Sequence, residues 1–270
     1  MNNWTRQDNV DVFNDTQRAI KNRKMLSDAV IASNAAQQYL IGDEFPSFEN
    51  RFETEAQIVV SRSTSFGAAV QYDGEIAVLN FASATNPGGG VINGSFAQEE
   101  CLCRCSTLYN NLICKDAMEK FYLPHRGGSP LHNDDIIYTP GVIIFKNDDY
   151  MDNGTTKKVN IITCAAPNLR ESPRYGKSET ISPNELLELH KRRGRKILAT
   201  AAANGNDFVI LGAFGCGAFS NDPKIVAEAY KQILPEFKHC FKVIEFAIYC
   251  REYETINYDI FKETFDVELK

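Results

Sequence analysis

Two adjacent glutamates, Glu99 and Glu100, have the residue type and the setting that chemistry at a sugar requires. They follow three successive glycines, Gly88–Gly90, after seven residues and Gln98. Cleavage of a glycosidic bond needs a carboxylic acid that protonates the leaving oxygen, and commonly a second carboxylate that positions or stabilises the sugar. The pair therefore indicates general acid catalysis at a glycosidic bond.

A second explanation of the glutamates stays open at the level of sequence. Apolar residues after Gln98 follow helical spacing, so Glu99 and Glu100 should lie at a helix start, where negative charge stabilises a helix by about 0.3–1 kcal/mol. Neighbouring residues of a helix point about 100° apart. Both can serve one ligand only if the turn is irregular or they address different atoms. The helix start favours an ionised carboxylate, whereas a second glutamate and a nearby diphosphate favour a protonated one.

The glycine run lies in a loop, Ser83–Gly90, that follows the apolar segment Ile76–Phe81. Without side chains, three glycines let backbone amides approach a ligand closely. A flexible surface loop would have the same composition. The preceding apolar strand favours a ligand loop, because α/β folds bind ligands beyond the carboxyl ends of their strands.

A second glycine-rich loop, Gly212–Asp222, follows the apolar segment Phe208–Leu211 and precedes a predicted helix that starts at Pro223. Asn221 or Asp222 can cap this helix. Such a loop is typical of an anion site. It lacks the Gly-Lys-Ser/Thr of a phosphate-transfer loop and the third glycine of the dinucleotide fingerprint, so it indicates binding of a diphosphate. Phe219 could stack on a sugar or base, or plug into the core.

The cysteines and histidines do not form a recognisable metal site. Cys101 and Cys105 would share a helix face while Cys103 points away, and the chain contains no Cys-x-x-Cys pair. The four histidines lack the spacing of a ligand set or a triad. We predict no metal and no cofactor.

The expected architecture is a three-layer α/β/α sandwich with a mixed central sheet, because strands that are apolar on both faces alternate with helical segments. Predicted strands are Gln57–Ser61, Ile76–Phe81, Val142–Phe145, Val159–Ala165, Phe208–Leu211 and Val243–Tyr249, and predicted helices span 98–120, 183–204 and 223–238. Residues 5–42 have a helical pattern of two or more helices. We therefore divide the chain into a helical N-terminal extension, residues 1–50, packed on a main domain, residues 51–270.

The composition limits the partners. A formal net charge of −6 and a pI near 5.4 predict no general nucleic-acid binding, so a polyanion must be bound locally by loop amides. The polar amino terminus predicts no secretory signal, and no segment is apolar enough to cross a membrane. We expect the eight cysteines to be thiols in a reducing cytoplasm.

The two loops and their flanking segments together resemble the poly(ADP-ribose) glycohydrolases, in particular the bacterial type built on a macrodomain. The resemblance extends over nearly the whole chain, and its motifs here are Asn86–Gly90, Gln98–Glu100, Tyr138–Val142, Thr163–Asn168, Leu211–Gly217 and Asn257–Phe261. It implies that Glu99 binds the ribose hydroxyls beside the scissile bond and that Glu100 protonates the leaving oxygen. It implies substrate contacts from Asn86, Gly88, Gly89, Gly90, Gln98, Gly215, Cys216, Gly217, Ala218 and Phe219.

The favoured hypothesis is hydrolysis of ribose–ribose bonds, from chain ends, in poly(ADP-ribose) carried by ADP-ribosylated proteins. Two alternatives remain: a macrodomain that binds ADP-ribose without cleaving it, and a hydrolase of mono-ADP-ribosylated substrates. A pure reader does not need an acid, so Glu99 and Glu100 distinguish it from an enzyme.

Overall fold

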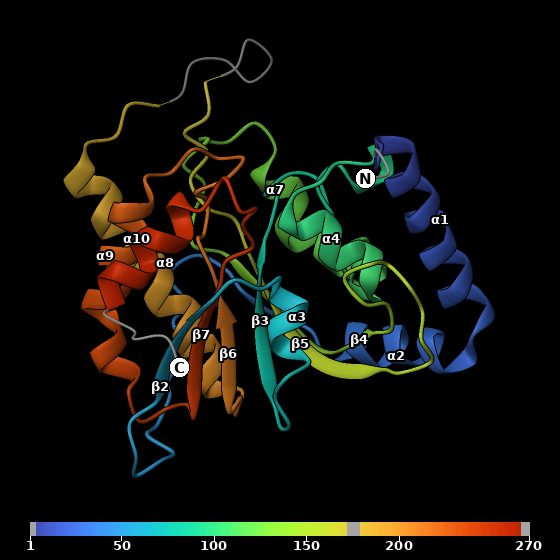
Figure 1. Ribbon diagram of the computed structural model, residues 1–270, viewed down its shortest axis with the longest axis horizontal. Helices are drawn as coiled ribbons and strands as arrows, with labels where there is room; N and C mark the ends of the chain where they lie inside the picture. Colours follow the sequence, from blue (N-terminus) through green and yellow to red (C-terminus); the bar gives the residue numbers. More distant parts are fainter. Residues whose placement is uncertain (1–3, 172–178, 266–270) are drawn as a thin grey trace.

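A seven-stranded mixed sheet forms the centre of the molecule in the computed structural model, which describes residues 4–171 and 179–265 (Figure 1). The strands lie in the order β1-β4-β5-β3-β6-β7-β2. Neighbours from β5 to β2 pair in parallel, whereas β4 pairs antiparallel with both β5 and β1. The bounds are β1 Gln38–Leu40, β2 Gln57–Ser61, β3 Ile76–Phe81, β4 Ile136–Ile144, β5 Lys157–Cys164, β6 Phe208–Leu211 and β7 Val243–Ala247.

Helices cover both faces of the sheet. One core cluster joins one face to α8 (Pro183–Ala203), α9 (Pro223–Ile233) and α10 (Ile256–Phe265), and a second joins the other face to α3 (Ser65–Ala69), α4 (Gln98–Cys105) and α5 (Leu108–Leu112). Figure 1 shows α8, α9 and α10 on one side of the sheet and α4 on the other. The predicted three-layer α/β/α architecture is confirmed.

The strand β4 begins earlier than predicted. The predicted strand started at Val142, directly after Pro140-Gly141. In the structure, the pairing of β4 with β5 shifts register between Thr139 and Val142, and Gly141 has a φ of +74°. Pro140 and Gly141 form a bulge in β4, so one strand continues from Ile136 to Ile144.

The prediction of one helix over residues 98–120 is wrong. α4 ends at Cys105 because Ser106 is extended and bridges Ile144 of β4. The backbone N–H groups of Phe145 and Lys146 donate to the Cys105 carbonyl, 3.0 and 3.2 Å away, in place of a further helical turn. Shorter pieces follow: α5, α6 (Lys115–Ala117), a π-helical turn η2 (Met118–Tyr122) and α7 (Leu123–His125).

The N-terminal segment contains two helices, α1 (Arg6–Asn22) and α2 (Lys24–Ala35), as predicted. Thr5 caps α1 through a capping box with Asp8. The helical prediction is wrong at residues 38–40, since this segment is β1, an edge strand of the central sheet. The boundary at residue 50 stays a prediction, and residues 1–3 and 266–270 lie outside the described residues.

α10 packs through Phe261, whose buried ring lies 5.3 Å from the ring of Phe246 in β7. We expect Phe261→Ala to lower the free energy of unfolding by about 3–5 kcal/mol, because it leaves a cavity in the core. Urea unfolding followed by circular dichroism measures this. Ile256→Ala on the same helix is the control, because Ile256 is 66% exposed and its truncation should leave stability nearly unchanged.

Candidate active site

The start of α4 is fixed to the end of β3 by the side chain of Gln98. Its amide nitrogen donates to the carbonyl of Leu79 at 2.7 Å, and its amide oxygen accepts from the N–H of Phe81 at 2.9 Å. The amide thus bridges two backbone groups of one strand. Because Gln98 is the first residue of α4, this contact places the following glutamates beside the glycine loop.

Both glutamates are buried, with 3% of Glu99 and 6% of Glu100 exposed. Glu99 accepts hydrogen bonds from the N–H of Ser83 at 2.8 Å and from the amide of Asn80 at 3.4 Å. Glu100 accepts at Oε1 from the N–H of Gly90 at 2.8 Å. Its second oxygen, Oε2, is buried and has no partner among the described residues.

The two carboxylates converge on one glycine. A Cβ at Gly89 would lie 2.5 Å from Oε1 of Glu100 and 3.1 Å from Oε2 of Glu99. Gly88 and Gly89 have φ values of +70° and +60°, which other residues rarely adopt. The loop therefore folds back over the helix start, and adjacent residues of a regular helix reach the same short stretch of backbone.

Burial raises the pKa of Glu99 to about 8, and the neighbouring Glu100 carboxylate acts in the same direction, against hydrogen bonds from Ser83 and Asn80. At this residue burial prevails over the helix start, which favours the ionised form. Glu99 therefore retains its proton at neutral pH.

The second loop follows β6 and is held from inside by Asn221. The buried amide nitrogen of Asn221 donates to the carbonyls of Pro167, Gly215 and Phe219 at 2.7, 3.1 and 3.3 Å. Across residues 4–171 and 179–265, the backbone N–H groups of Gly217, Ala218 and Phe219 donate no hydrogen bond. These three consecutive donors are available to an anion. Asp222 caps α9 and Pro223 is its first residue, as predicted.

The sheet brings the two loops to one edge. β3 and β6 are neighbouring parallel strands, so their carboxyl ends lie side by side. The ring of Phe81, the last residue of β3, lies 5.6 Å from the ring of Phe214 in the second loop. Loops that are more than 100 residues apart in sequence thus share one rim.

Not all predicted site residues have the same setting. Asn86 is exposed in the first loop, and Cys216 is half-buried, so that burial raises the pKa of its thiol. Phe219 is partly buried against the core, with its ring 6.4 Å from that of His132. This position leaves part of the ring accessible at the rim.

Three residues that hold the site in place were not predicted from the sequence: Asn80, Ser83 and Asn221. Asn80 carried a signal, because an amide in an otherwise apolar strand requires a buried partner. Asn221 was considered only as a helix cap, and its amide instead bonds inside the loop. Within the described ranges, no three His, Cys, Asp or Glu side chains are grouped to hold a metal ion.

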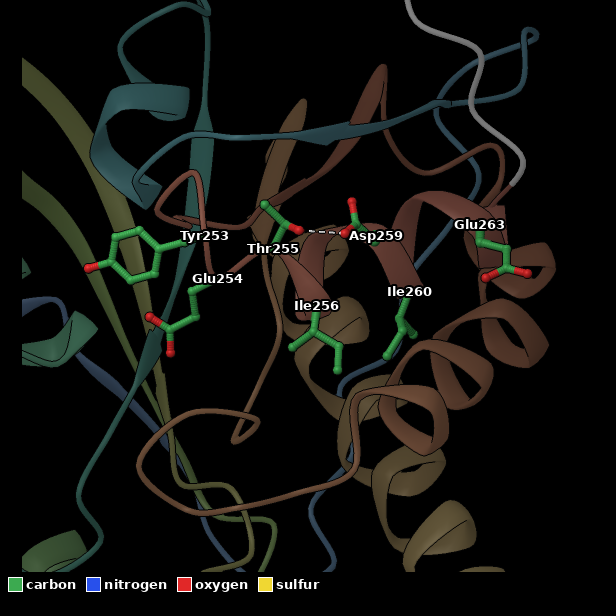
Figure 2. Close-up of a pocket in the computed structure, with 7 residues that line it drawn as sticks. All are labelled: Tyr253, Glu254, Thr255, Ile256, Asp259, Ile260 and Glu263. Atoms are coloured by element: carbon green, nitrogen blue, oxygen red, sulfur yellow. Dashed lines mark hydrogen bonds between the residues drawn. The ribbon is translucent and has the colours of Figure 1, made fainter.

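A shallow hollow of about 400 Å³ lies elsewhere, at the start of α10 (Figure 2). Tyr253, Ile256 and Asp259 are among its lining residues, and Thr255 donates to Asp259 at 2.6 Å. None of the predicted site residues lines it. It is therefore separate from the two glycine-rich loops.

Comparison with known proteins identifies the family. The sequence profile of the microbial-type PARG catalytic domain matches residues 3–147, more than half of the chain. The chain belongs to this family. Among curated proteins, no sequence matches it.

Solved structures of PARG, poly(ADP-ribose) glycohydrolase, are similar over most of their length. The enzyme from Thermomonospora curvata is 28% identical with a TM-score of 0.84, over 96% of this chain and 100% of that one. Its complex with the inhibitor ADP-HPD has a TM-score of 0.80 at 28% identity, over 95% and 99%. The Deinococcus radiodurans enzyme in complex with ADP-ribose is 30% identical with a TM-score of 0.74, over 88% and 96%.

The raised pKa of Glu99 in this PARG family member predicts a pH-dependent stability. Between its ordinary pKa of 4.5 and about 8, the unfolded chain loses the Glu99 proton while the folded protein keeps it. The free energy of unfolding should therefore fall as pH rises through this range, on the order of 5 kcal/mol in total.

Glu99→Gln should remove this dependence, and Asn80 can satisfy the new amide by turning its unpartnered oxygen toward it. The measurement is urea unfolding of parent and variant at about pH 5 and about pH 8. An equal loss of stability in both proteins over this range would contradict the assignment.

Proposed function

We propose that this chain hydrolyses ribose–ribose O-glycosidic bonds of poly(ADP-ribose) and releases ADP-ribose from chain ends. Family membership supports the poly(ADP-ribose) glycohydrolase activity. The observation that carries the mechanism is the buried carboxyl group of Glu100: its Oε1 lies beside Gly89 and accepts from the N–H of Gly90, while its Oε2 has no partner among the described residues and is available to a ligand in the loop.

In this proposal Glu100 is the general acid. Its Oε2 proton passes to the leaving ribose oxygen as the bond between that oxygen and the anomeric carbon breaks. Water then adds to the anomeric carbon and returns a proton to the Glu100 carboxylate. Oε1 stays bound to the N–H of Gly90 and keeps the side chain oriented.

Glu99 is proposed to bind the ribose hydroxyls next to the scissile bond. The N–H of Ser83 fixes its Oε2, and the longer contact from Asn80 to Oε1 leaves that oxygen able to exchange partners. The pair shares one proton, because burial disfavours two charges in this place. Burial holds this proton on Glu99 in the free protein, and in this proposal it passes to Oε2 of Glu100 when the ribose hydroxyls donate to Glu99.

The diphosphate is proposed to lie between the two loops. The free N–H groups of Gly217–Phe219 are suited to a phosphate, and the glycines of the first loop allow the backbone to approach it. Phe219 then orients the distal ribose. Asn86 and Cys216 complete the contacts in this proposal, while Gln98 acts by holding β3 and α4 together.

This arrangement favours an enzyme over a module that only binds ADP-ribose, because two buried carboxylates would add cost without benefit to a protein that only binds an anionic ligand.

ADP-ribosylated proteins are the proposed carriers of the substrate. Across the described chain, no helix has both the length and the apolar character to cross a membrane. The eight free thiols are consistent with our proposal of a cytoplasmic location.

Glu100→Gln should abolish hydrolysis and preserve binding. The amide keeps the shape and the bond to Gly90 but cannot donate the acidic proton, so kcat on labelled poly(ADP-ribose) should fall about 10²–10⁴-fold. Calorimetry should give an ADP-ribose affinity close to that of the parent. Glu119→Gln, at an exposed position, is the control. Hydrolysis by Glu100→Gln at the rate of the parent would refute the role of Glu100.

Gly217 tests the phosphate contact without disturbing the fold. Its φ lies outside the left-handed region, and a Cβ there would meet no atom within 4 Å. Gly217→Leu should therefore fold normally and weaken ADP-ribose binding at least 10-fold by covering the free amides. Gly128→Leu, at an exposed glycine without left-handed backbone, is the matched control. Equal affinity in both variants would contradict the proposed anion site.

A further inference from the structure

The inward face of α1 contacts the glycine loop and its supports at successive turns. Asn9, Phe13 and Thr16 are buried on this face, while Asn14 on the same helix is exposed. In Figure 1, α1 lies beside α4 and far from α8–α10. We propose that α1 is a positioning element of the active site, and that Asn9 is its principal positioning residue. This inference rests on the proposed hydrolysis.

Asn9 connects α1 to the segment between the glycines and the glutamates. Its amide nitrogen donates to the carbonyl of Gly94 at 3.0 Å, and its amide oxygen accepts from the indole N–H of Trp4 at 2.8 Å. The side chain is fully buried. Asn9 therefore holds Gly94 with a side chain that is itself fixed at its other end.

The backbone of α1 approaches position 94 so closely that only a glycine fits there. Gly94 has a φ of +71°, and a Cβ there would collide with the backbone of Arg6 in the first turn of α1. The backbone of α1 thus packs directly against the loop backbone. A shift of α1 must be transmitted to the loop, because nothing compressible lies between them.

A short series of contacts continues from Gly94 to the proposed acid. The next residue, Ser95, donates its N–H to the carbonyl of Gly90 at 3.2 Å, and its carbonyl accepts from Arg104 of α4 at 2.7 Å. Gly90 in turn donates to Oε1 of Glu100. Asn9 is therefore linked through Gly94, Ser95 and Gly90 to the carboxylate of Glu100.

Two further contacts of α1 support the same unit. The ring of Phe13 meets the ring of Tyr109 edge-on at 4.9 Å, and Tyr109 lies where a Cβ of Gly88 would be. Thr16 donates to the carbonyl of Arg104 at 2.5 Å, in the last turn of α4. α1 thus contacts the glycine loop from behind and the end of the helix that carries both glutamates.

A helix that only stabilised the fold would have a different effect when altered. It would change the fraction of folded protein and leave the kinetics of each folded molecule intact. Misplacement of a catalytic group by about 1 Å lowers the rate about 100-fold even when the substrate still binds. A split between kcat and binding therefore separates the two roles.

The experiment compares Asn9→Ala with Asn14→Ala, which truncates the same residue type on the exposed face of the same helix. We expect Asn9→Ala to lower kcat on poly(ADP-ribose) about 10–100-fold, after correction for the folded fraction from urea unfolding. Its affinity for ADP-ribose by calorimetry should stay within about 3-fold, because the second loop still holds the diphosphate. Asn14→Ala should match the parent in both measurements.

Thr16→Val is the second variant, because it keeps the side-chain volume and removes only the bond to Arg104. Thr16→Val should lower kcat in the same way, and it replaces Asn9→Ala as the test if Asn9→Ala does not fold. The inference is overturned if Asn9→Ala has the kcat of the parent per folded molecule. If Asn9→Ala does not fold, the same result for Thr16→Val overturns it. Either result leaves the proposed function intact. A parent protein that releases no ADP-ribose overturns the proposed function, and the inference with it.

Discussion

The candidate active site depends on burying two carboxylates against a glycine backbone that can come close to both. Gly89 has a left-handed conformation, and its missing side chain leaves the space into which the carboxylates of Glu99 and Glu100 point. A charge in such a place is costly unless hydrogen bonds or a proton compensate it. Ser83, Asn80 and Gly90 donate hydrogen bonds to the carboxylates. Glu99 also keeps its proton, because burial raises its pKa.

The rest of the fold serves to maintain this unfavourable arrangement. Gln98 fixes the start of α4 to β3, and α1 supports the connecting segment from the other side. Both supports are single amide side chains whose nitrogen and oxygen are engaged. An amide is suited to this task because it donates and accepts at the same time without adding a charge beside the glutamates.

The proposed phosphate site follows a different principle. There the charge belongs to the ligand, and the second loop contributes backbone donors that stay free. Asn221 holds this loop through three carbonyls, and within the described residues the N–H groups of Gly217–Phe219 donate no hydrogen bond. A chain with a net charge of −6 can thus provide a local site for a polyanion.

The sequence by itself determined the local features. These are the strands β2, β3 and β6 at their observed residues, the start of α9 with Asp222 as one of two candidate caps, and the two glycine-rich loops, of which the first is followed by the glutamates. These depend on residue periodicity and on the conformations that glycine and proline allow. The layered fold followed from the alternation of strands and helices.

Only the tertiary structure decided how these parts meet. The break of the 98–120 segment depends on the residues that directly follow β4, because the N–H groups of Phe145 and Lys146 donate to the Cys105 carbonyl. The strand β1 forms because a free edge of the sheet is available to residues 38–40. The convergence of Glu99 and Glu100 and the role of α1 depend on contacts between residues distant in sequence. Local preferences cannot encode them, because burial and backbone hydrogen bonding are settled only when the whole chain has packed.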